Sequence, residues 1–382
     1  MNGAERLLFS ERPAGYCLEL RVEIRDMRIG FWIKNARSIA LPQSALPCLT
    51  AVILCIGQDG FVWWLAIPVV LGICAAHLGM NLADDYFDYK HDSRTRADIS
   101  STSVRARMEK CHYLGERLEV KGERLEEKAT VNELGWAVVG FLAFAGMMGS
   151  MAFVAQWLLN GWQAAMGIII YAVLGLIIGI NYSGKPLELG FHGLGELVIG
   201  LMFGPLLMLG VQAALTGTAF SWEMLCMSIG IGCMVTNIVY VHSVMEVNAD
   251  AELGKMTFAR LLKSKVWMII FIGLFAMMPF VMLGLGIAMG WWSAWYLLTL
   301  ATLPMSIYLI HSTRLFAYGL PREDTPHWWM GPMGDWEGYK KAGIDWFLYR
   351  WLLARNICTF FCLILMIVHC VSLVFSERFA TV

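Results

Sequence analysis

The sequence predicts an all-α, polytopic membrane protein with about nine transmembrane helices around a central cavity. Three observations predict this fold class. Apolar residues make up 58% of the 382 residues and charged residues 15%, with a mean hydropathy of +0.59, whereas soluble domains carry about 25% charged residues. Apolar runs of about twenty residues, long enough to cross ~30 Å of hydrocarbon, recur along the chain. Lys and Arg gather in every second connection between these runs.

Nine apolar runs are the expected spans. The first is interrupted by Pro42 and Pro47, so we expect an uneven, tilted span there. Residues 1–39 hold seven basic residues and no isolated apolar core, so no cleavable signal peptide is expected. In chain order the runs are 40–57, 61–83, 134–158, 162–182, 194–215, 222–241, 266–288, 291–311 and 351–374.

The distribution of Lys and Arg predicts a cytoplasmic N-terminus, because basic connections resist translocation. In that orientation the inner segments hold 28 of the 29 basic residues, and only Arg378 lies outside. The chain then divides into a cytoplasmic or interfacial segment at 1–39, a transmembrane domain at 40–374 and a short outer tail at 375–382. A net charge of −1 gives no basic surface for phosphate backbones, so no nucleic-acid partner is expected.

Two inner connections are long. In the insert at 93–130 acidic and basic residues are interleaved, which predicts a solvated, helical excursion into the cytoplasm. The loop at 312–350 is rich in Trp and Tyr, above all from 326 onwards. That composition is typical of a segment in the headgroup layer. We therefore expect it to anchor the chain to the membrane and not to stack on an aromatic substrate.

The second apolar run ends in an acidic group. Asn81, Asp84, Asp85 and Asp88 are three or four residues apart, so a continuing helix places them on one face. Carboxylates at a membrane edge are energetically costly and usually mark function. This group therefore predicts a set of oxygen ligands for a metal ion.

A second acidic group follows the sixth run. His242, Glu246 and Asp250 are again four residues apart, with Lys255 behind them. The two groups share one predicted side of the membrane, and their five carboxylates repel each other unless cations lie between them. Magnesium is the expected cation, because it prefers hard oxygen ligands and shares them with water and phosphate. The alternative is a solvated rim of acids paired with neighbouring basic residues.

A third polar segment joins the fourth and fifth runs. Pro186 and the glycines at 193 and 195 interrupt the helix and predict a short re-entrant turn near the same inner face. Lys185 can neutralise phosphate. Tyr182 can hydrogen-bond a phosphate or an aromatic hydroxyl, or it can be an ordinary interfacial aromatic residue. Glu196 is expected to be an acid stabilised by a helix N-terminus, outside the binding site.

Together these segments resemble the UbiA superfamily of intramembrane prenyltransferases, and within it the 1,4-dihydroxy-2-naphthoate polyprenyltransferases of menaquinone synthesis. Residues 81–88 resemble the first motif of that family, Asn-Leu-x-Asn-Asp-Tyr-x-Asp, with Asp84 in place of its second Asn, and residues 245–255 resemble the second, Arg-Asp-Ile-Glu-x-Asp-x-x-x-Gly-Lys. Residues 182–186 and 193–196 are similar to its Tyr-Thr-Gly-Gly-Pro and Gly-Leu-Gly-Glu segments. Residues 31–42, which include Arg37, resemble its N-terminal segment.

The resemblance implies an enzyme that transfers a polyprenyl group from an allylic diphosphate to an aromatic acceptor, here 1,4-dihydroxy-2-naphthoate, with Mg²⁺ as cofactor. It implies partners of three kinds: a polyprenyl diphosphate, an aromatic acceptor and the lipid bilayer. The expected location is the bacterial inner membrane, with the active site toward the cytoplasm. The implied catalytic residues are Asp85, Asp88, Glu246 and Asp250, the metal ligands are these four with Asn81, and the substrate-binding residues are Asn81, Asp84, Tyr182, Lys185, Lys255, Arg37, Arg260 and His242.

Other functions are compatible with the same acids. A UbiA-type enzyme with another acceptor, 4-hydroxybenzoate or a different lipid, would share the motifs. A cation- or proton-coupled transporter also uses intramembrane acids, but near the bilayer midplane and on broken helices, whereas these acids cluster at one end. An inert assembly subunit would use them to bind a basic partner. Release of diphosphate from an allylic donor distinguishes the enzyme from the other two classes.

Overall fold

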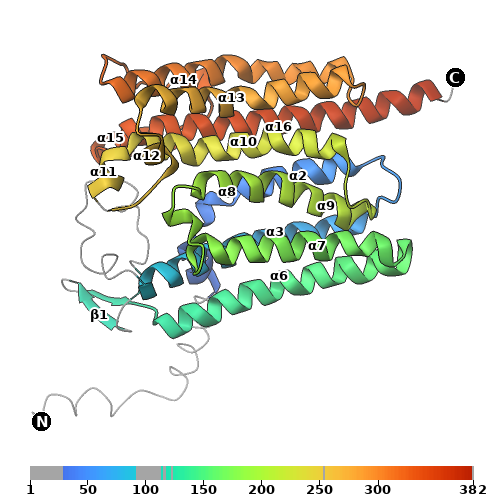
Figure 1. Cartoon of the computed structure of the whole chain (residues 1–382), viewed down its shortest axis with the longest axis horizontal. Helices are drawn as coiled ribbons and strands as arrows, with labels where there is room; N and C mark the ends of the chain where they lie inside the picture. Colours follow the sequence, from blue (N-terminus) through green and yellow to red (C-terminus); the bar gives the residue numbers. More distant parts are fainter. Residues whose placement is uncertain (1–28, 92–112, 115–117, 122–123, 253, 381–382) are drawn as a thin grey trace, which may run out of the picture.

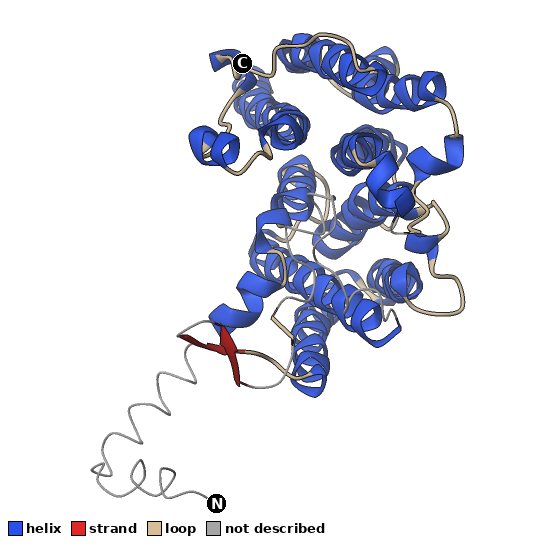
Figure 2. Cartoon of the chain, turned by 90° about the vertical axis from the view of Figure 1, so that its left-hand side faces the viewer, coloured by secondary structure: helices blue, strands red, loops and turns tan. Residues whose placement is uncertain are grey.

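The computed structural model describes residues 29–91, 113–114, 118–121, 124–252 and 254–380. Over these ranges the chain forms an elongated bundle whose long helices run side by side along the longest axis (Figure 1). Seen from one end, most of the helices are viewed down their axes (Figure 2). Nine helical segments of the described chain are long and apolar enough to cross a membrane, which confirms the nine predicted spans.

The first four spans are long helices with clear start and stop signals. A short 3₁₀ turn leads into α2, which starts at Pro42, where the missing N–H costs nothing. α6 starts in a capping box made by Thr130 and Glu133. Gly161, with φ 85°, then turns the chain directly into α7. The bounds are α2 Pro42–Cys55, α3 Ala66–His91, α6 Val131–Asn160 and α7 Trp162–Ser183.

The fifth span is interrupted in its middle. It consists of α8 Gly195–Leu201, a π-helical turn Met202–Leu206 and α9 Leu207–Thr216. Pro205 lies inside the π turn, where it removes a backbone donor. A Cβ added to Gly204 would lie 2.5 Å from the Ser228 carbonyl oxygen and 2.6 Å from Gly232 Cα. The fifth span therefore packs backbone against backbone on α10, an approach that only small residues permit.

The last four spans are α10 Trp222–Met245, α13 Lys265–Ala288, a 3₁₀ stretch Ala294–Thr302 that continues into α14 Leu303–Tyr318, and α16 Asp345–Ala380. Between them lie the short helices α11 Val247–Glu252, α12 Phe258–Leu262 and α15 Trp336–Lys341. α14 ends at Gly319, which has φ 65°. The predicted end of this span at 311 was therefore too early, and residues 312–318 belong to the helix and not to the loop.

α10 is the central helix of the bundle. In the most apolar stretch of α10, 78% of the residues are buried within the protein, whereas only 6% are buried in the most apolar stretch of α6. α10 packs against α8, α13 and α16, and α6 packs on α3. The apolar surface of α6 therefore faces outward, where a bilayer would cover it.

The insert at 93–130 differs from its prediction. Residues 118–121 and 124–127 form two antiparallel strands, β1 Leu118–Lys121 and β2 Arg124–Glu127, with Val120 opposite Leu125. The helical prediction is wrong for these residues. The sequence Leu118-Glu-Val-Lys alternates apolar and charged residues with the period of a strand, and the high charge of the insert hid this short alternation. Residues 93–112, 115–117 and 122–123 of the insert lie outside the described residues.

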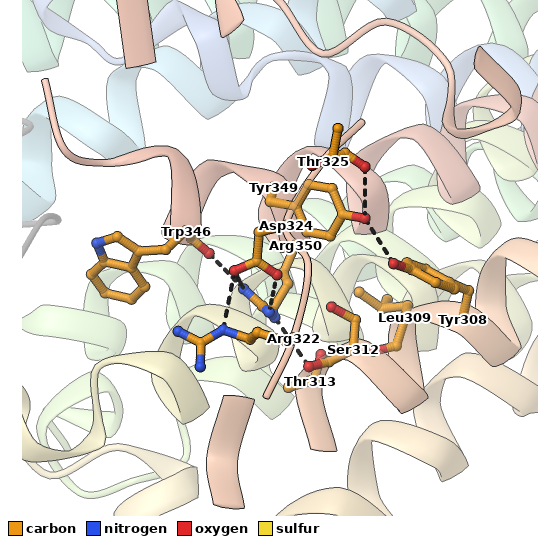
Figure 3. Close-up of polar contacts among 10 residues, drawn as sticks. All are labelled: Tyr308, Leu309, Ser312, Thr313, Arg322, Asp324, Thr325, Trp346, Tyr349 and Arg350. Atoms are coloured by element: carbon orange, nitrogen blue, oxygen red, sulfur yellow. Dashed lines mark hydrogen bonds and ion pairs between the residues drawn. The ribbon is translucent and has the colours of Figure 1, made fainter. Parts of the chain in front are cut away.

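The connection that follows α14 is fixed by a buried arginine (Figure 3). Arg350 of α16 is fully buried, and its guanidinium bonds both carboxylate oxygens of Asp324, at 2.6 and 3.2 Å. It also donates to the carbonyl oxygens of Trp346, at 2.7 Å, and Ser312, at 3.3 Å. The Arg350–Asp324 pair thus holds the loop between α14 and α15 against the start of α16.

The aromatic residues after 326 divide into two sets. Trp328 is 93% exposed, so the prediction of a membrane anchor stands for this side chain. Tyr349 and Trp351 are buried within the described chain, because both belong to the first turns of α16. The anchoring prediction is wrong for these two, which stabilise the helix packing instead.

Candidate active site

α3 remains helical through the first acidic group, so Asn81, Asp84, Asp85 and Asp88 share one face as predicted. Asp85 is 1% exposed and Asp88 is 9% exposed. Tyr113, from the insert, donates its hydroxyl hydrogen to Asp85 Oδ2 at 2.9 Å. The first acidic group therefore consists of carboxylates withdrawn from bulk water, and residues from outside α3 bind it.

Arg37 lies against this group from the segment that precedes α2. Its Nη2 is 2.9 Å from Asp84 Oδ2 and 3.3 Å from Asp85 Oδ1, and it donates to the Asn81 carbonyl at 2.8 Å. Its φ of 56° lies in the left-handed region, which side chains rarely adopt. Burial lowers the pKa of the guanidinium, but the negative charges of Asp85, Asp84 and Asp88 outweigh burial and raise the pKa. Arg37 is therefore always cationic.

The end of α7 connects the first acidic group to α8. Ser183 donates its hydroxyl hydrogen to Asp84 Oδ1. The neighbouring Tyr182 packs against two glycines of the next turn: a Cβ added to Gly195 would lie 3.2 Å from its hydroxyl oxygen, and one added to Gly190 would lie 3.2 Å from its ring. A side chain at either glycine would thus have to displace this tyrosine slightly. Tyr182 directly precedes Ser183, which bonds Asp84, and its role in binding substrate stays a prediction.

The second acidic group surrounds a bend at the end of α10. Glu246 is 3% and Asp250 1% exposed. Glu246, with φ −103° and ψ 16°, separates α10 from α11. The hydrogen bonds nevertheless continue at four-residue steps, from the Glu246 N–H to the His242 carbonyl at 3.1 Å and from the Asp250 N–H to the Glu246 carbonyl at 2.8 Å. The helical spacing of the two acids therefore survives the bend.

The segment that carries Lys255 is held by Arg260. The Arg260 Nη1 donates to the Asp250 carbonyl at 3.3 Å and to the Lys255 carbonyl. Arg260 was predicted to bind substrate, which stays a prediction, and in the structure its Nη1 shapes the loop. Lys255 and Arg260 are both half-buried.

Glu196 connects α8 to the second acidic group. Its Oε1 accepts a hydrogen bond from Ser243 Oγ at 2.6 Å, and both of its oxygens lie 3.2 Å from the backbone nitrogen of Phe258, which donates to them. Glu196 does begin a helix, as predicted, but its hydrogen bonds go to α10 and α12. A series of contacts thus runs from the first acidic group to Ser243, three residues before Glu246, at Asp84, Ser183, Tyr182, Gly195, Glu196 and Ser243.

Two predicted binding residues lie less centrally. Lys185 is exposed beyond the end of α7 and precedes a cis peptide bond to Pro186. The His242 ring packs on the Phe347 ring, with 4.5 Å between centroids, so it takes part in the contact between α10 and α16. Lys185 remains accessible to an anion, whereas His242 has a packing role as well.

The acids fit a magnesium ion whose ligands come partly from the substrate and water. Within the ranges that the structure describes, no three His, Cys, Asp or Glu side chains gather closely enough to hold a metal ion by themselves. Protein-bound Mg²⁺ usually takes one or two carboxylates and completes its shell with water and substrate phosphate. The buried Asp85, Asp88, Glu246 and Asp250 are the hard oxygen donors that such sharing requires. They therefore fit Mg²⁺ bound together with a diphosphate, and not a closed protein cage.

A cavity of about 500 Å³ lies apart from the acids. It is lined by α14 residues including Ile307, Tyr308 and His311, and by Trp329. Ile307 is 55% exposed, so the cavity opens on an outer face of the bundle. It contains none of the predicted site residues, and it is not the candidate active site.

Sequence reasoning missed the residues that connect the acids. Tyr113 lies in a long charged insert, and Ser183 and Ser243 are small hydroxyl residues next to more prominent neighbours. Their contacts with Asp85, Asp84 and Glu196 join positions far apart in the chain. Their position next to predicted site residues could have indicated them, because Ser183 directly follows Tyr182 and Ser243 directly follows His242.

Comparison with known families gives one match. Residues 133–323 match the model of the UbiA prenyltransferase family. This region starts in α6 and ends beyond α14, so it includes the second acidic group and the Tyr182–Glu196 segment.

Individual relatives agree with this match. A protein of Mycobacterium tuberculosis named 1,4-dihydroxy-2-naphthoate octaprenyltransferase is 26% identical over 60% of this chain and 68% of its own. One of Synechocystis named 2-carboxy-1,4-naphthoquinone phytyltransferase is 29% identical over 32% of this chain and 38% of its own. The solved structure of a digeranylgeranylglyceryl phosphate synthase superposes with a TM-score of 0.51 and 12% identity, over 89% of this chain and 99% of that one. It supports the fold.

Proposed function

The chain belongs to the UbiA prenyltransferase family and is an integral, multi-pass membrane enzyme, and from this premise we propose which group it transfers and to what. The reaction is transfer of a polyprenyl group from an allylic diphosphate to an aromatic acceptor of the 1,4-dihydroxy-2-naphthoate class, in quinone biosynthesis. The observation that carries the proposal is the burial of acids at the ends of both α3 and α10, with a contact series that runs from Asp84 to Ser243, three residues before Glu246.

The acceptor is proposed from the relatives. Proteins named 1,4-dihydroxy-2-naphthoate octaprenyltransferase occur among them in two mycobacteria, at 26% and 24% identity. The residues around the first acidic group also resemble that family's motif over the whole of 81–88. With this acceptor the attacked ring carbon carries a carboxylate, so that prenyl transfer would be accompanied by loss of carbon dioxide.

Mg²⁺ would be held by Asn81, Asp85, Asp88, Glu246 and Asp250 together with the donor diphosphate. Bound there, it would neutralise the charge that develops on the departing diphosphate. The burial of these acids supports this role, because an anion and a cation attract more strongly where water is displaced. Asp84 positions Arg37 and Ser183 at the edge of the group.

The chain's own cations would bind the diphosphate oxygens. Arg37 is cationic and lies at the first acidic group. Lys255 follows the second group on a loop shaped by Arg260, and Lys185 is exposed near the end of α7. Tyr182, next to Ser183, can donate a hydrogen bond to the diphosphate or to the acceptor. His242, one turn before Glu246, borders the same region.

The proposed location is the bacterial inner membrane, with the acids toward the cytoplasm. The support is the bias of Lys and Arg, because 28 of 29 lie on the side that carries the acids. In this orientation the acids meet a soluble diphosphate head and an aromatic acid from the cytoplasm. The prenyl chain lies among the apolar spans, away from water that would quench an allylic cation.

The test is an assay of the purified protein in detergent with Mg²⁺, geranyl diphosphate and a panel of aromatic acids. We expect release of diphosphate and formation of a prenylated product with 1,4-dihydroxy-2-naphthoate. Product with 4-hydroxybenzoate alone would overturn the acceptor but not the reaction class. Absence of diphosphate release with every acceptor and donor length would overturn the reaction, and ion transport into liposomes would then favour the transporter.

A further inference from the structure

Glu196 is a buried carboxylate whose contacts all lead to the segments around the second acidic group. It is 6% exposed and lies in the first turn of α8. Ser243, one turn before Glu246, donates to it, and so does the Phe258 N–H, three residues after Lys255. One carboxylate therefore bonds directly to the two segments that flank the second acidic group.

The bond to Phe258 satisfies the start of α12 from another helix. α12 has Thr257 at its N-cap position, and the Thr257 side chain makes no capping hydrogen bond. Both oxygens of Glu196 lie 3.2 Å from the Phe258 nitrogen, the first donor of that helix. Glu196 thus accepts from one of the N-terminal N–H groups that a helix cannot bond internally.

The loop from α7 to α8 and the loop from α11 to α12 also contact each other directly. His192 and Met256 form a parallel bridge, and a Cβ added to Gly193 would lie 3.3 Å from the Thr257 carbonyl oxygen. The loop from α7 to α8 is therefore packed along the loop from α11 to α12. The Glu196 hydrogen bond to Phe258 continues this contact between the two loops as far as the start of α12.

We propose that Glu196 is a positioning residue: its carboxylate joins α8, α10 and α12 so that the loops bearing Lys185 and Lys255 approach the second acidic group in one fixed arrangement. The proposal rests on the proposed function, because it assigns those loops to diphosphate binding. Glu196 does not itself bind the diphosphate. Its charge would repel an anion, and both of its oxygens accept hydrogen bonds from the protein.

The first experiment measures amide hydrogen exchange, which needs no activity. In Glu196→Ala we expect faster exchange in residues 254–262, led by Phe258, while α13 keeps its protection. In Glu196→Gln the amide oxygen can accept from Phe258 and the amide nitrogen can donate to Ser243, so protection should remain. Glu188→Ala, a control in the same loop, should change nothing in 254–262. Unchanged exchange in Glu196→Ala would overturn the proposal.

The second experiment measures kinetics with Mg²⁺ and an allylic diphosphate. Substitutions of residues that orient the ligands of a metal site typically reduce metal affinity or activity about 10- to 100-fold. We expect Glu196→Ala to raise the KM for the diphosphate by about that factor, with the KM for the aromatic acceptor within about twofold, and Glu196→Gln to restore most of the loss. An equal rise in both KM values, or a loss in Gln as large as in Ala, would overturn a positioning role. An inactive wild type would instead overturn the proposed function, and the exchange result would still stand.

Discussion

The ends of α3 and α10, which carry the acidic groups, and the start of α16, which carries a buried ion pair, lie at the same end of the bundle (Figure 1), and the two kinds of cluster differ in how their charges are matched. At the start of α16, Arg350 and Asp324 have opposite charges and bond each other twice. In the acidic groups on α3 and beyond α10, carboxylates of one sign are buried on different spans. The ion pair is complete within the protein and stabilises the fold. Several buried carboxylates at the ends of two spans are costly even where they have partners, and this cost is what predicts a site.

The largest effect should come from neutralising the acids without changing their shape. Asp85→Asn and Glu246→Gln should each reduce diphosphate release by at least about 100-fold, because the departing diphosphate loses electrostatic support. The apparent melting temperature should change little, because each amide keeps the size and shape of the carboxylate it replaces and Arg37 still pairs with Asp84. Activity assays and thermal unfolding in the same detergent measure both. Full activity in either variant would contradict the assignment.

Removal of divalent cations should reproduce this loss reversibly. Chelation with EDTA should stop diphosphate release, and added Mg²⁺ should restore it, because the acids then regain their neutralising ions. Mg²⁺ with a non-hydrolysable allylic diphosphate should also raise the melting temperature of the wild type. Asp85→Asn is the control and should show a much smaller rise. Undiminished turnover in EDTA would refute the metal requirement.

The Arg350–Asp324 pair should respond in the opposite sense, with loss of stability rather than of chemistry. Arg350→Met removes the buried partner of Asp324 and leaves it paired with the exposed Arg322, and breaking a buried ion pair costs about 3–5 kcal/mol of unfolding free energy. We expect a clear fall in melting temperature, while the protein that remains folded keeps its activity per molecule. Arg314→Met, an exposed arginine on α14, is the matched control and should leave the melting temperature unchanged. Equal melting temperatures for the two variants would show that the pair contributes little.

The difference between the two clusters also explains what the sequence could predict. The nine spans follow from hydropathy, and the shared face of Asn81, Asp85 and Asp88 follows from helical spacing alone. The role of Arg350 could not be predicted from the sequence, because an arginine near the end of a span is usually an interfacial charge. Its partner Asp324 lies 26 residues earlier, and no local pattern relates the two. The aromatic residues around it suggested a membrane anchor for the same reason.

The contacts that lead from one acidic group toward the other could not be predicted from the sequence either. Glu196 has the position of a common helix N-terminal acid, and its bond to Phe258 joins residues 62 positions apart. The strands at 118–121 and 124–127 were missed because four-residue alternation is weak against a strongly charged background. Sequence spacing thus predicts which side chains share a helix face. It does not predict which helices a single polar side chain will join.

The smallest expected effect tests how much support the first acidic group needs from outside α3. Tyr113→Phe removes only the hydroxyl that donates to Asp85 Oδ2, and the ring can keep its edge contacts with Phe31 and Trp32. A hydrogen bond to a charged group contributes about 1.5–3 kcal/mol, but Arg37 still pairs with the carboxylate. We therefore expect turnover to fall by less than about tenfold, with a raised requirement for Mg²⁺, because Asp85 loses one of the groups that orient it. Tyr89→Phe, a nearby hydroxyl deletion on α3, is the comparison, and magnesium titrations of the two variants measure the difference. A loss in Tyr113→Phe as severe as that in Asp85→Asn would mean that Tyr113 itself contacts the reacting groups, and the first acidic group would then include the insert as a functional part.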